Sequence, residues 1–173
     1  MKMNQIFLQN FLSLHCIEVV RHEHAAVMTV AESEQLVPKL PGAKTKNLFL
    51  RDKKGLKHFL VTIPASLSVD LAQLGDALGA GRLGFASAER LLKHLGLTPG
   101  SVSVLGLVND AEHCVQCVID QNLWDAEAIQ AHPLINTATM VVPHAQLEKF
   151  LAATGHTPLI IHVPAANPQS DQP

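Results

Sequence analysis

Cysteine is scarce in this sequence, which has Cys16, Cys114 and Cys117 among 173 residues. An odd and sparse set does not make a disulfide framework, and it favours a reducing compartment such as the cytoplasm. Long apolar runs are also missing, and none approaches the length of a membrane span. The stretch Met1–Leu14 is interrupted by polar residues and has no small-residue cleavage site, so we do not interpret it as a signal peptide.

Positive charge is not in excess either. The chain has 13 Lys and Arg residues against 15 Asp and Glu residues, a formal charge of -2. A bulk basic field for nucleic acid is therefore absent, and any RNA contact must come from a local patch. The 47% of hydrophobic residues suffice for a core, and the length favours one domain. We expect this domain to span residues 1–165 and the polar, Pro-rich residues 166–173 to form a disordered tail.

Hydrophobic periodicity and turn residues predict interleaved helices and strands. Helices are expected over residues 4–14, 68–78, 87–95 and 144–153, with a short helix or turn over 33–40. Strands are expected over residues 16–20, 47–51, 57–63, 102–108, 114–119 and 137–142, followed by a core segment over 159–163. The order does not alternate strictly, which predicts an α/β (α+β) fold with a mixed sheet and flanking helices.

Three segments match known ligand-binding motifs but lack the context or the further ligands that such sites need. Gly79–Gly84 matches G-x-G-x-x-G, but it follows a predicted helix, so we interpret it as a connection and not as a dinucleotide site. Cys114 and Cys117 form one half of a zinc site without a second pair, and a strand would point them to opposite faces. His22 and His24 have no third ligand nearby. The sequence therefore predicts neither a metal site nor a cofactor.

Two segments are more informative. Residues 44–54 place four lysines and one arginine around an apolar strand. This pattern is typical of a solvated hairpin whose lysines protect an edge, and equally of a cationic patch for phosphates. In residues 132–139, Pro133 restricts His132 to an extended backbone, and small and hydroxyl residues that suit a tight pocket follow. By itself, such a histidine is more often a surface or core residue than a catalytic one.

Six ordered blocks together carry a resemblance to a known family. They read KNLFLRDKK (46–54), RLGFAS (82–87), LTPGSV (97–102), GLVND (106–110), HPLINTAT (132–139) and GHTP (155–158). The chain resembles the YbaK/ProX family of prolyl-tRNA editing proteins over residues 42–163, in particular the free-standing alanyl-tRNA(Pro) deacylases. The resemblance implies an α/β domain with a curved, barrel-like mixed sheet. It also implies hydrolysis of the ester between an amino acid and the 3′ adenosine of tRNA, without metal or cofactor.

The resemblance also implies a set of site residues. The catalytic residues would be Lys46, Asn47 and His132; the substrate-binding residues Gly100, Ser101, Asn136 and Thr137; and the tRNA contacts Lys44, Arg51, Lys53, Lys54 and Arg82. Lys46 would hold a phosphate or ribose and offset negative charge, while Asn47 would orient a carbonyl. His132 would orient water or cap the pocket, and backbone N–H groups near Gly100 would bind the oxyanion.

One position departs from the family pattern. The family's G-x-x-x-P loop keeps Gly100 here but has Val104 in place of the proline, which leaves the loop less rigid. The expected activity is removal of alanine from tRNA(Pro) in trans. The alternatives are removal of Cys or Ser, or a catalytically silent module that binds tRNA or a synthetase. A metal or redox protein built on Cys114 and Cys117 would contain zinc, which we do not expect.

The resemblance implies partners as well. These are the aminoacylated acceptor end of a tRNA and either prolyl-tRNA synthetase or an elongation factor, with no membrane. We expect a cytoplasmic monomer or weak homodimer.

Overall fold

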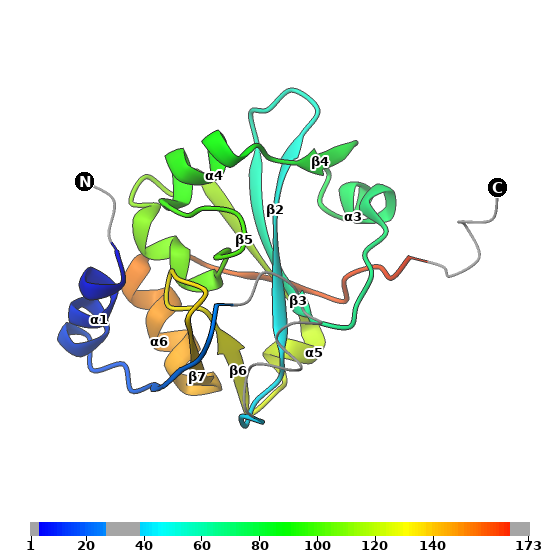
Figure 1. The fold of residues 1–173 in the computed structure, drawn as a ribbon. Helices are drawn as coiled ribbons and strands as arrows, with labels where there is room; N and C mark the ends of the chain where they lie inside the picture. Colours follow the sequence, from blue (N-terminus) through cyan, green and yellow to red (C-terminus); the bar gives the residue numbers. More distant parts are fainter. Residues whose placement is uncertain (1–3, 27–38, 167–173) are drawn as a thin grey trace.

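The computed structural model describes residues 4–26 and 39–166, in which two β-sheets are covered by helices (Figure 1). The three-stranded sheet has the order β1 (Val20–Glu23), β7 (Ala138–Pro143) and β6 (Ala128–Ala131). The five-stranded sheet has the order β4 (Leu83–Phe85), β2 (Thr45–Asp52), β3 (His58–Pro64), β5 (Val115–Asp120) and β8 (Leu159–Ile161). Because β3, β5 and β8 pair in parallel while β4, β2 and β3 pair antiparallel, the predicted mixed sheet is confirmed.

Local capping residues fix the helix boundaries. The helices are α1 (Gln5–Leu14), α3 (Leu71–Ala77), α4 (Ala88–Leu95), α5 (Gln121–Trp124) and α6 (His144–Thr154), with a 3₁₀ helix η1 (Val104–Asn109). The side chains of Asn4, Asp70 and Ser87 accept hydrogen bonds from the first turns of α1, α3 and α4. Gly155 ends α6 with a φ of 74°. In the described part of the chain, no helix combines the length and apolarity that a membrane crossing needs.

The hairpin of β2 and β3 forms as the sequence predicts. Its turn is closed by Asp52, whose Oδ1 accepts hydrogen bonds from the N–H groups of Leu56 (2.8 Å) and Lys57 (2.9 Å). These bonds lower the pKa of the Asp52 carboxyl, with the bond from Lys57 as the largest cause. The Asp52 side chain is therefore used inside the turn, and the lysines around it remain outside.

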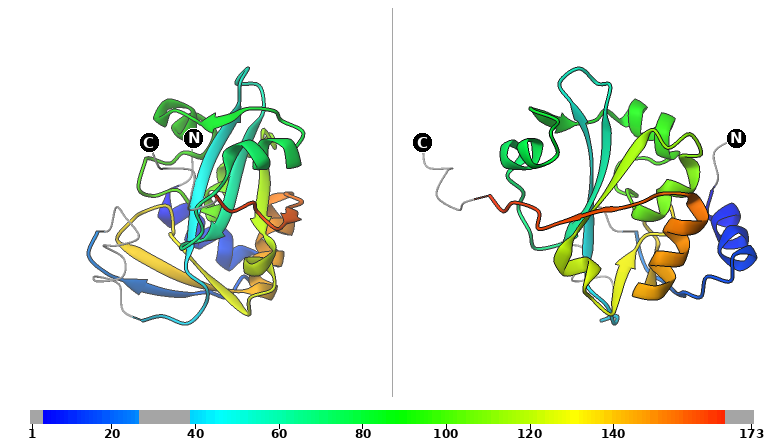
Figure 2. Two further views of the ribbon diagram at one scale, coloured as in Figure 1. Left: turned by 90° about the vertical axis from the view of Figure 1, so that its right-hand side faces the viewer. Right: turned by 180° about the vertical axis from the view of Figure 1, so that it is seen from behind.

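Two hydrophobic clusters lie on opposite faces of the five-stranded sheet. Because side chains alternate along a strand, Phe49 joins the larger cluster with α1, α4, η1 and α6, and Leu50 joins the smaller one with α3. Phe11 of α1 meets Phe150 of α6 edge to face, with ring centroids 6.1 Å apart. Seen from behind, the C-terminal segment runs beside β5 and on toward α3, where Ala165 bridges to Val69 (Figure 2).

Several predicted elements are wrong. The strand predicted over 16–20 begins only at Val20, and the strand predicted over 102–108 is the 3₁₀ helix η1. Ser103 caps η1, and a side chain at Gly106 would meet Leu97 at 2.7 Å, so this apolar run is buried on all sides and resembles a strand in sequence. Ala166, predicted as tail, donates its N–H to the Ser68 carbonyl. The helix or turn predicted over 33–40 and the rest of the tail lie largely outside the described residues.

Candidate active site

The two sheets meet where the chain enters β2. The N–H of Ala43 donates to the carbonyl of Ala128 (2.8 Å), and the N–H of Gln130 donates to the carbonyl of Ala43 (2.9 Å). This is a parallel bridge between the start of β2 and β6. Thr45 reinforces it, because its hydroxyl donates to the carbonyl of Gln130 (2.6 Å). Lys46 and Asn47 follow this bridge by three and four residues on one chain segment, and His132 follows it by three residues on the other, directly after β6.

Gln130 holds the preceding loop against β6. Its side-chain Nε2 donates to the carbonyls of Leu40 (3.0 Å), Gly42 (3.1 Å) and Pro41 (3.3 Å). Gln130 is only 8% exposed, so this amide is held inside the protein. This amide therefore ties residues 40–42 to β6 just before the chain enters β2.

The amide of Asn47 is oriented by its cross-strand neighbour. Asn47 pairs with Thr62 of β3, and the hydroxyl of Thr62, which is fully buried, donates to Asn47 Oδ1 (2.8 Å). This bond occupies the amide oxygen and leaves the two N–H groups of Nδ2 as donors. Asn47 is thus arranged to donate to a carbonyl or an oxyanion.

Lys46 and Asn47 leave β2 on opposite faces, because their positions alternate along the strand. β4 pairs with β2 only from Leu50 to Asp52. Among the described residues, β6 bridges to the chain at Ala43, before β2 begins, and no named strand pairs with β2 at Lys46 and Asn47 on the side of β4. A long side chain such as that of Lys46 can reach round this open edge, toward an anion lying along it.

His132 is neutral at physiological pH. Its Nδ1 lies 3.1 Å from the carbonyl of Ala138, which can only accept, so Nδ1 carries the proton and Nε2 carries the lone pair. Burial lowers the pKa of His132 below 6.5; the bond to Ala138 raises it and the nearby His24 lowers it further. The loop after it is strained, since Leu134 adopts a φ of 65°.

His24 is a neighbour of this site that the sequence analysis missed. Its Nε2 lies 2.9 Å from Thr139 Oγ1, and its Nδ1 lies 2.7 Å from the carbonyl of Ala25. Its ring centroid is 6.4 Å from that of His132. The sequence carried no local signal for this, because His24 and Thr139 are 115 positions apart and meet only through the pairing of β1 with β7.

The predicted substrate-binding residues lie in two loops. Gly100, with a φ of 88°, and the buried Ser101 lie between α4 and η1, and no hydrogen bond among the described residues joins them to the three predicted catalytic residues. Asn136 is half-buried and Thr137 is exposed in the loop after His132, where the carbonyl of Thr137 accepts the N–H of His24. In the described part of the chain, the second loop is thus linked by a hydrogen bond to the surroundings of His132.

Val104, which replaces the family's proline, is fully buried as the first residue of η1. The hydroxyl of Ser103 accepts the N–H of Leu105 (3.2 Å) directly after it. The Ser103 cap therefore fixes the start of η1. In relatives with a proline at the position of Val104, the proline ring itself would restrict the backbone there.

The side chains predicted to contact tRNA differ in solvent exposure and in their hydrogen bonds. Lys53 and Lys54 are exposed in the hairpin turn, and Arg82 is exposed just before β4. Lys44 is half-buried before β2. Arg51 is engaged within the hairpin, because its Nη1 donates to the carbonyls of Asp52 (2.9 Å) and Lys53 (3.3 Å).

Cys114 lies at the surface and Cys117 lies in the core, in agreement with the predicted placement of the two side chains on opposite faces of a strand. Cys117 is 1% exposed, and burial raises the pKa of its thiol to about 12, whereas Cys114 is exposed. Across residues 4–26 and 39–166, no group of three or more His, Cys, Asp and Glu side chains is placed to hold a metal.

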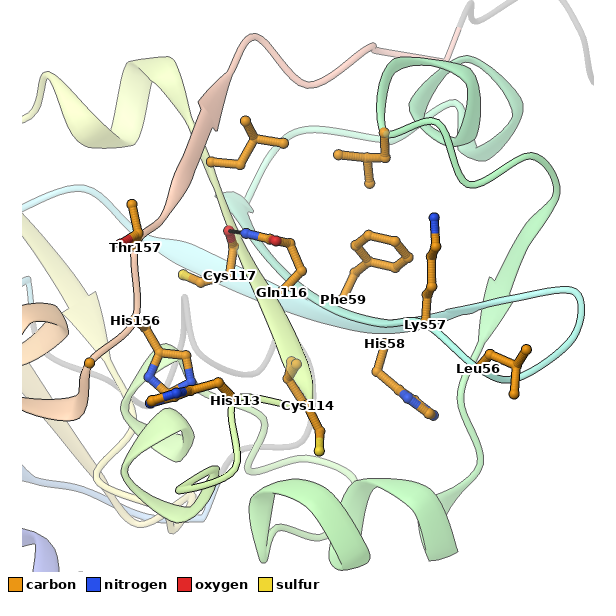
Figure 3. A pocket seen from close by; sticks show the side chains of 14 residues that line it. Leu56, Lys57, His58, Phe59, His113, Cys114, Gln116, Cys117, His156 and Thr157 are labelled. Carbon is orange, nitrogen blue, oxygen red and sulfur yellow. Dashed lines mark hydrogen bonds between the residues drawn. The ribbon is translucent and has the colours of Figure 1, made fainter.

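A hollow of about 490 Å³ lies against β3, β5 and the segment that leads into β8 (Figure 3). Its lining includes His113 and His156, but none of the predicted site residues. His156 Nε2 lies 3.3 Å from Asp110 Oδ2, and His113 Nε2 donates to the carbonyl of Thr154 (3.0 Å). These two histidines are therefore used to hold loops together.

Comparison with known proteins decides the family. Residues 24–150 match the family described as aminoacyl-tRNA editing domain. The chain belongs to this family. Its class of activity is therefore hydrolysis of aminoacyl-tRNA esters, which the sequence predicted from the six blocks.

Similar proteins carry related names. The chain is 42% identical over 135 residues to Prolyl-tRNA editing protein ProX from Acetoanaerobium sticklandii, covering 78% of this chain and 82% of that protein. It is 40% identical over 156 residues to Prolyl-tRNA synthetase associated domain-containing protein 1 from Danio rerio, covering 89% and 84%. A solved structure described as a candidate trans-editing enzyme for prolyl tRNA synthetase superimposes with a TM-score of 0.68 at 20% identity, covering 96% of this chain and 99% of that one. This last likeness bears on the fold alone.

Proposed function

We propose that this protein acts in trans on mischarged tRNA(Pro) and removes alanine by hydrolysis of the ester. Support comes from membership of the editing family and from the prolyl-tRNA names of its relatives. The observation that supports the proposal is the parallel bridge at Ala43, which joins the chain just before Lys46–Asn47 to β6, the strand that ends directly before His132. Prolyl-tRNA synthetase or an elongation factor would deliver the substrate in the cytoplasm.

The reaction adds water to the ester carbonyl and releases the amino acid and the ribose hydroxyl. His132 Nε2 accepts a hydrogen bond from the water and orients it toward the carbonyl carbon. Negative charge develops on the carbonyl oxygen, where the Nδ2 donors of Asn47 and the backbone N–H groups near Gly100 stabilise it. Lys46 neutralises the terminal phosphate or ribose oxygens. The attacking water gives up one proton and the departing ribose oxygen takes one up, and the neighbouring hydroxyl of the tRNA can carry this proton from one to the other.

Discrimination in this reaction is by size. A small pocket admits alanine, whereas small apolar differences are worth only about 1–3 kcal/mol in binding. Steric exclusion of proline must therefore be combined with recognition of the tRNA itself. We infer that Asn136 and Thr137, in the loop after His132, border the amino-acid side chain.

The test is deacylation of Ala-, Cys-, Ser- and Pro-tRNA(Pro) by the wild type and by Lys46→Ala. We expect rapid loss of alanine alone and a kcat/KM for Lys46→Ala that is roughly 100-fold lower, because the cation that holds the terminal phosphate or ribose oxygens beside the ester is removed. Lys149→Ala, which removes an exposed lysine on α6, is the matched control and should behave as the wild type. Loss of Cys or Ser instead would change the substrate, and binding of tRNA without any hydrolysis would favour a silent binding module.

The pH dependence of the deacylation rate should reflect the protonation of His132. Since its pKa lies below 6.5, the neutral form is present at pH 7, and activity should persist until the pH falls through this lowered value. Below it, Nε2 gains a proton and can no longer accept from water. Single-turnover rates between pH 5 and 8, corrected for spontaneous hydrolysis, would measure this acidic limb, the loss of activity as the pH falls. A midpoint above 6.5, or the same limb in His132→Gln, would contradict the assignment.

A further inference from the structure

The loop over residues 132–137 connects β6 to β7 and contains three residues assigned to the site, His132, Asn136 and Thr137. In this described part of the chain, none of the loop residues belongs to a helix or strand. The backbone is also strained, with a φ of 65° at Leu134. A strained segment keeps one conformation only where its surroundings hold it. The position of the His132 ring therefore depends on contacts from outside the loop.

His24 binds the chain on both sides of Ala138, where this loop enters β7. Its backbone N–H donates to the carbonyl of Thr137 (3.0 Å), and its Nε2 lies 2.9 Å from the hydroxyl oxygen of Thr139. The carbonyl of Ala138, between these two residues, accepts from Nδ1 of His132 (3.1 Å). The peptide group that orients the His132 ring is therefore held by His24 from both sides.

The side-chain bond between His24 and Thr139 has a defined direction. His24 Nδ1 lies 2.7 Å from the carbonyl of Ala25, which can only accept, so Nδ1 carries the proton of the neutral ring. Nε2 then carries the lone pair and accepts from the Thr139 hydroxyl. Thr139 is only 5% exposed, and a buried hydroxyl is costly to leave without a partner. Both the donor and the acceptor of this bond are thus fixed by their surroundings.

Backbone pairing alone would hold this position weakly. β1 lies at the edge of the three-stranded sheet, and its last pair joins Glu23 to Ala138 of β7. The end of an element with few buried contacts opens locally at a low cost in free energy. His24 is the first residue after this pair, so its side-chain bond to Thr139 fixes the end of β1 against β7.

His24 also affects the charge of the His132 ring. The two ring centroids are 6.4 Å apart. β6 and β7 contain no titratable residue, and on β1 the side chains of Arg21 and Glu23 pair with each other at 2.6 Å. Besides burial, which is the larger cause, the neighbouring His24 lowers the pKa of His132. A charge on His24 thus disfavours a second charge on His132 and favours the neutral ring that can accept from water.

We propose that His24 is a positioning residue of the deacylation site, which orients His132 through Thr137, Thr139 and the Ala138 carbonyl between them. The inference rests on the proposed function and adds a residue to its site. Without His24, the Ala138 carbonyl is no longer held beside Nδ1, and the Nε2 lone pair no longer has one fixed direction. The water that it orients is then misplaced, and a misplacement of about 1 Å can lower a rate by about 100-fold.

Kinetics of four variants test this role. His24→Ala should lower the kcat for Ala-tRNA(Pro) by about 10- to 100-fold and leave the KM unchanged, because the substrate contacts remain. His24→Gln keeps an acceptor near the place of Nε2 and should retain most of the activity. Thr139→Val removes the hydroxyl and should lose as much as His24→Ala, and the double variant should lose no more, since both changes break one bond. His162→Gln, at an exposed histidine after β8, is the matched control with no expected change.

NMR of the histidine ring nitrogens tests the positioning without hydrolysis. The signals of His132, assigned with His132→Gln, should show the proton on Nδ1 in the wild type and in His24→Gln, but a mixture of both tautomers in His24→Ala. Circular dichroism melting shows which variants are folded, and Thr139→Val replaces His24→Ala if the latter is not. A wild-type kcat in the folded variant would overturn the inference. An unchanged tautomer would also overturn it, whether or not the wild type hydrolyses Ala-tRNA(Pro), so its failure is distinct from that of the proposed function.

Discussion

Asn47→Ala is expected to lower the kcat of Ala-tRNA(Pro) hydrolysis by about 100- to 1000-fold, the usual effect of removing one oxyanion donor. Thr62 fixes the Asn47 amide, with its hydroxyl 2.8 Å from Oδ1, so the Nδ2 donors are oriented before the substrate arrives. A donor that needs no reorganisation stabilises the developing charge most effectively. The loss should therefore appear in kcat under saturating substrate, measured in single-turnover experiments.

Two further variants separate this role from a structural one. Asn47→Asp keeps the shape but replaces the donors with a carboxylate, so it should lose at least as much activity as Asn47→Ala. Thr62→Val keeps the volume and removes the hydroxyl that orients the amide, and we expect an intermediate loss of kcat. Circular dichroism melting would show whether each variant is folded. A folded Asn47→Ala with a wild-type kcat would exclude Asn47 from the reaction.

Elements whose cause is local could be predicted from the sequence. Asn4 and Ser87 are cap residues directly before apolar helical patterns, and both helices begin where these residues indicate. The polar turn around Asp52 between two apolar runs likewise gave the hairpin of β2 and β3. Lys46 and Asn47 could be named only through the resemblance, because nothing in their spacing distinguishes them from other strand residues.

Elements whose cause is non-local could not be predicted. Ala128–Ala131 is short, and it is β6 because it pairs with β7 and bridges to Ala43. Val104–Asn109 is entirely buried, so its apolar run carries no period that separates a 3₁₀ helix from a strand. His24 reaches the site only through the pairing of β1 with β7. Each depends on a partner distant in sequence.

Asp110→Ala is expected to cost about 3 kcal/mol of unfolding free energy, because each buried group left without its hydrogen-bond acceptor costs about 1–3 kcal/mol. Asp110 is 4% exposed. Its carboxylate accepts from the N–H groups of Cys114 (3.0 Å) and Val115 (2.8 Å), and its Oδ2 lies 3.3 Å from His156 Nε2. The substitution leaves the N–H groups of Cys114 and Val115, and the buried imidazole of His156, without this acceptor. Urea unfolding at pH 7 would measure the loss, with Asp76→Ala on the exposed side of α3 as the control.

The pH dependence of that loss identifies the carboxylate as its source. Burial alone would raise the pKa of Asp110, but the bonds from His156, Val115 and Cys114 outweigh it and hold the pKa below 3.8. A group whose pKa is lowered by folding contributes stability above its unfolded pKa, and this contribution is lost as the pH falls through the folded value. The difference between wild type and Asp110→Asn should therefore be constant from pH 7 to about pH 5 and shrink below about pH 4. A difference that stays constant down to pH 3 would show that packing, and not the ionised carboxylate, holds the loop between η1 and β5.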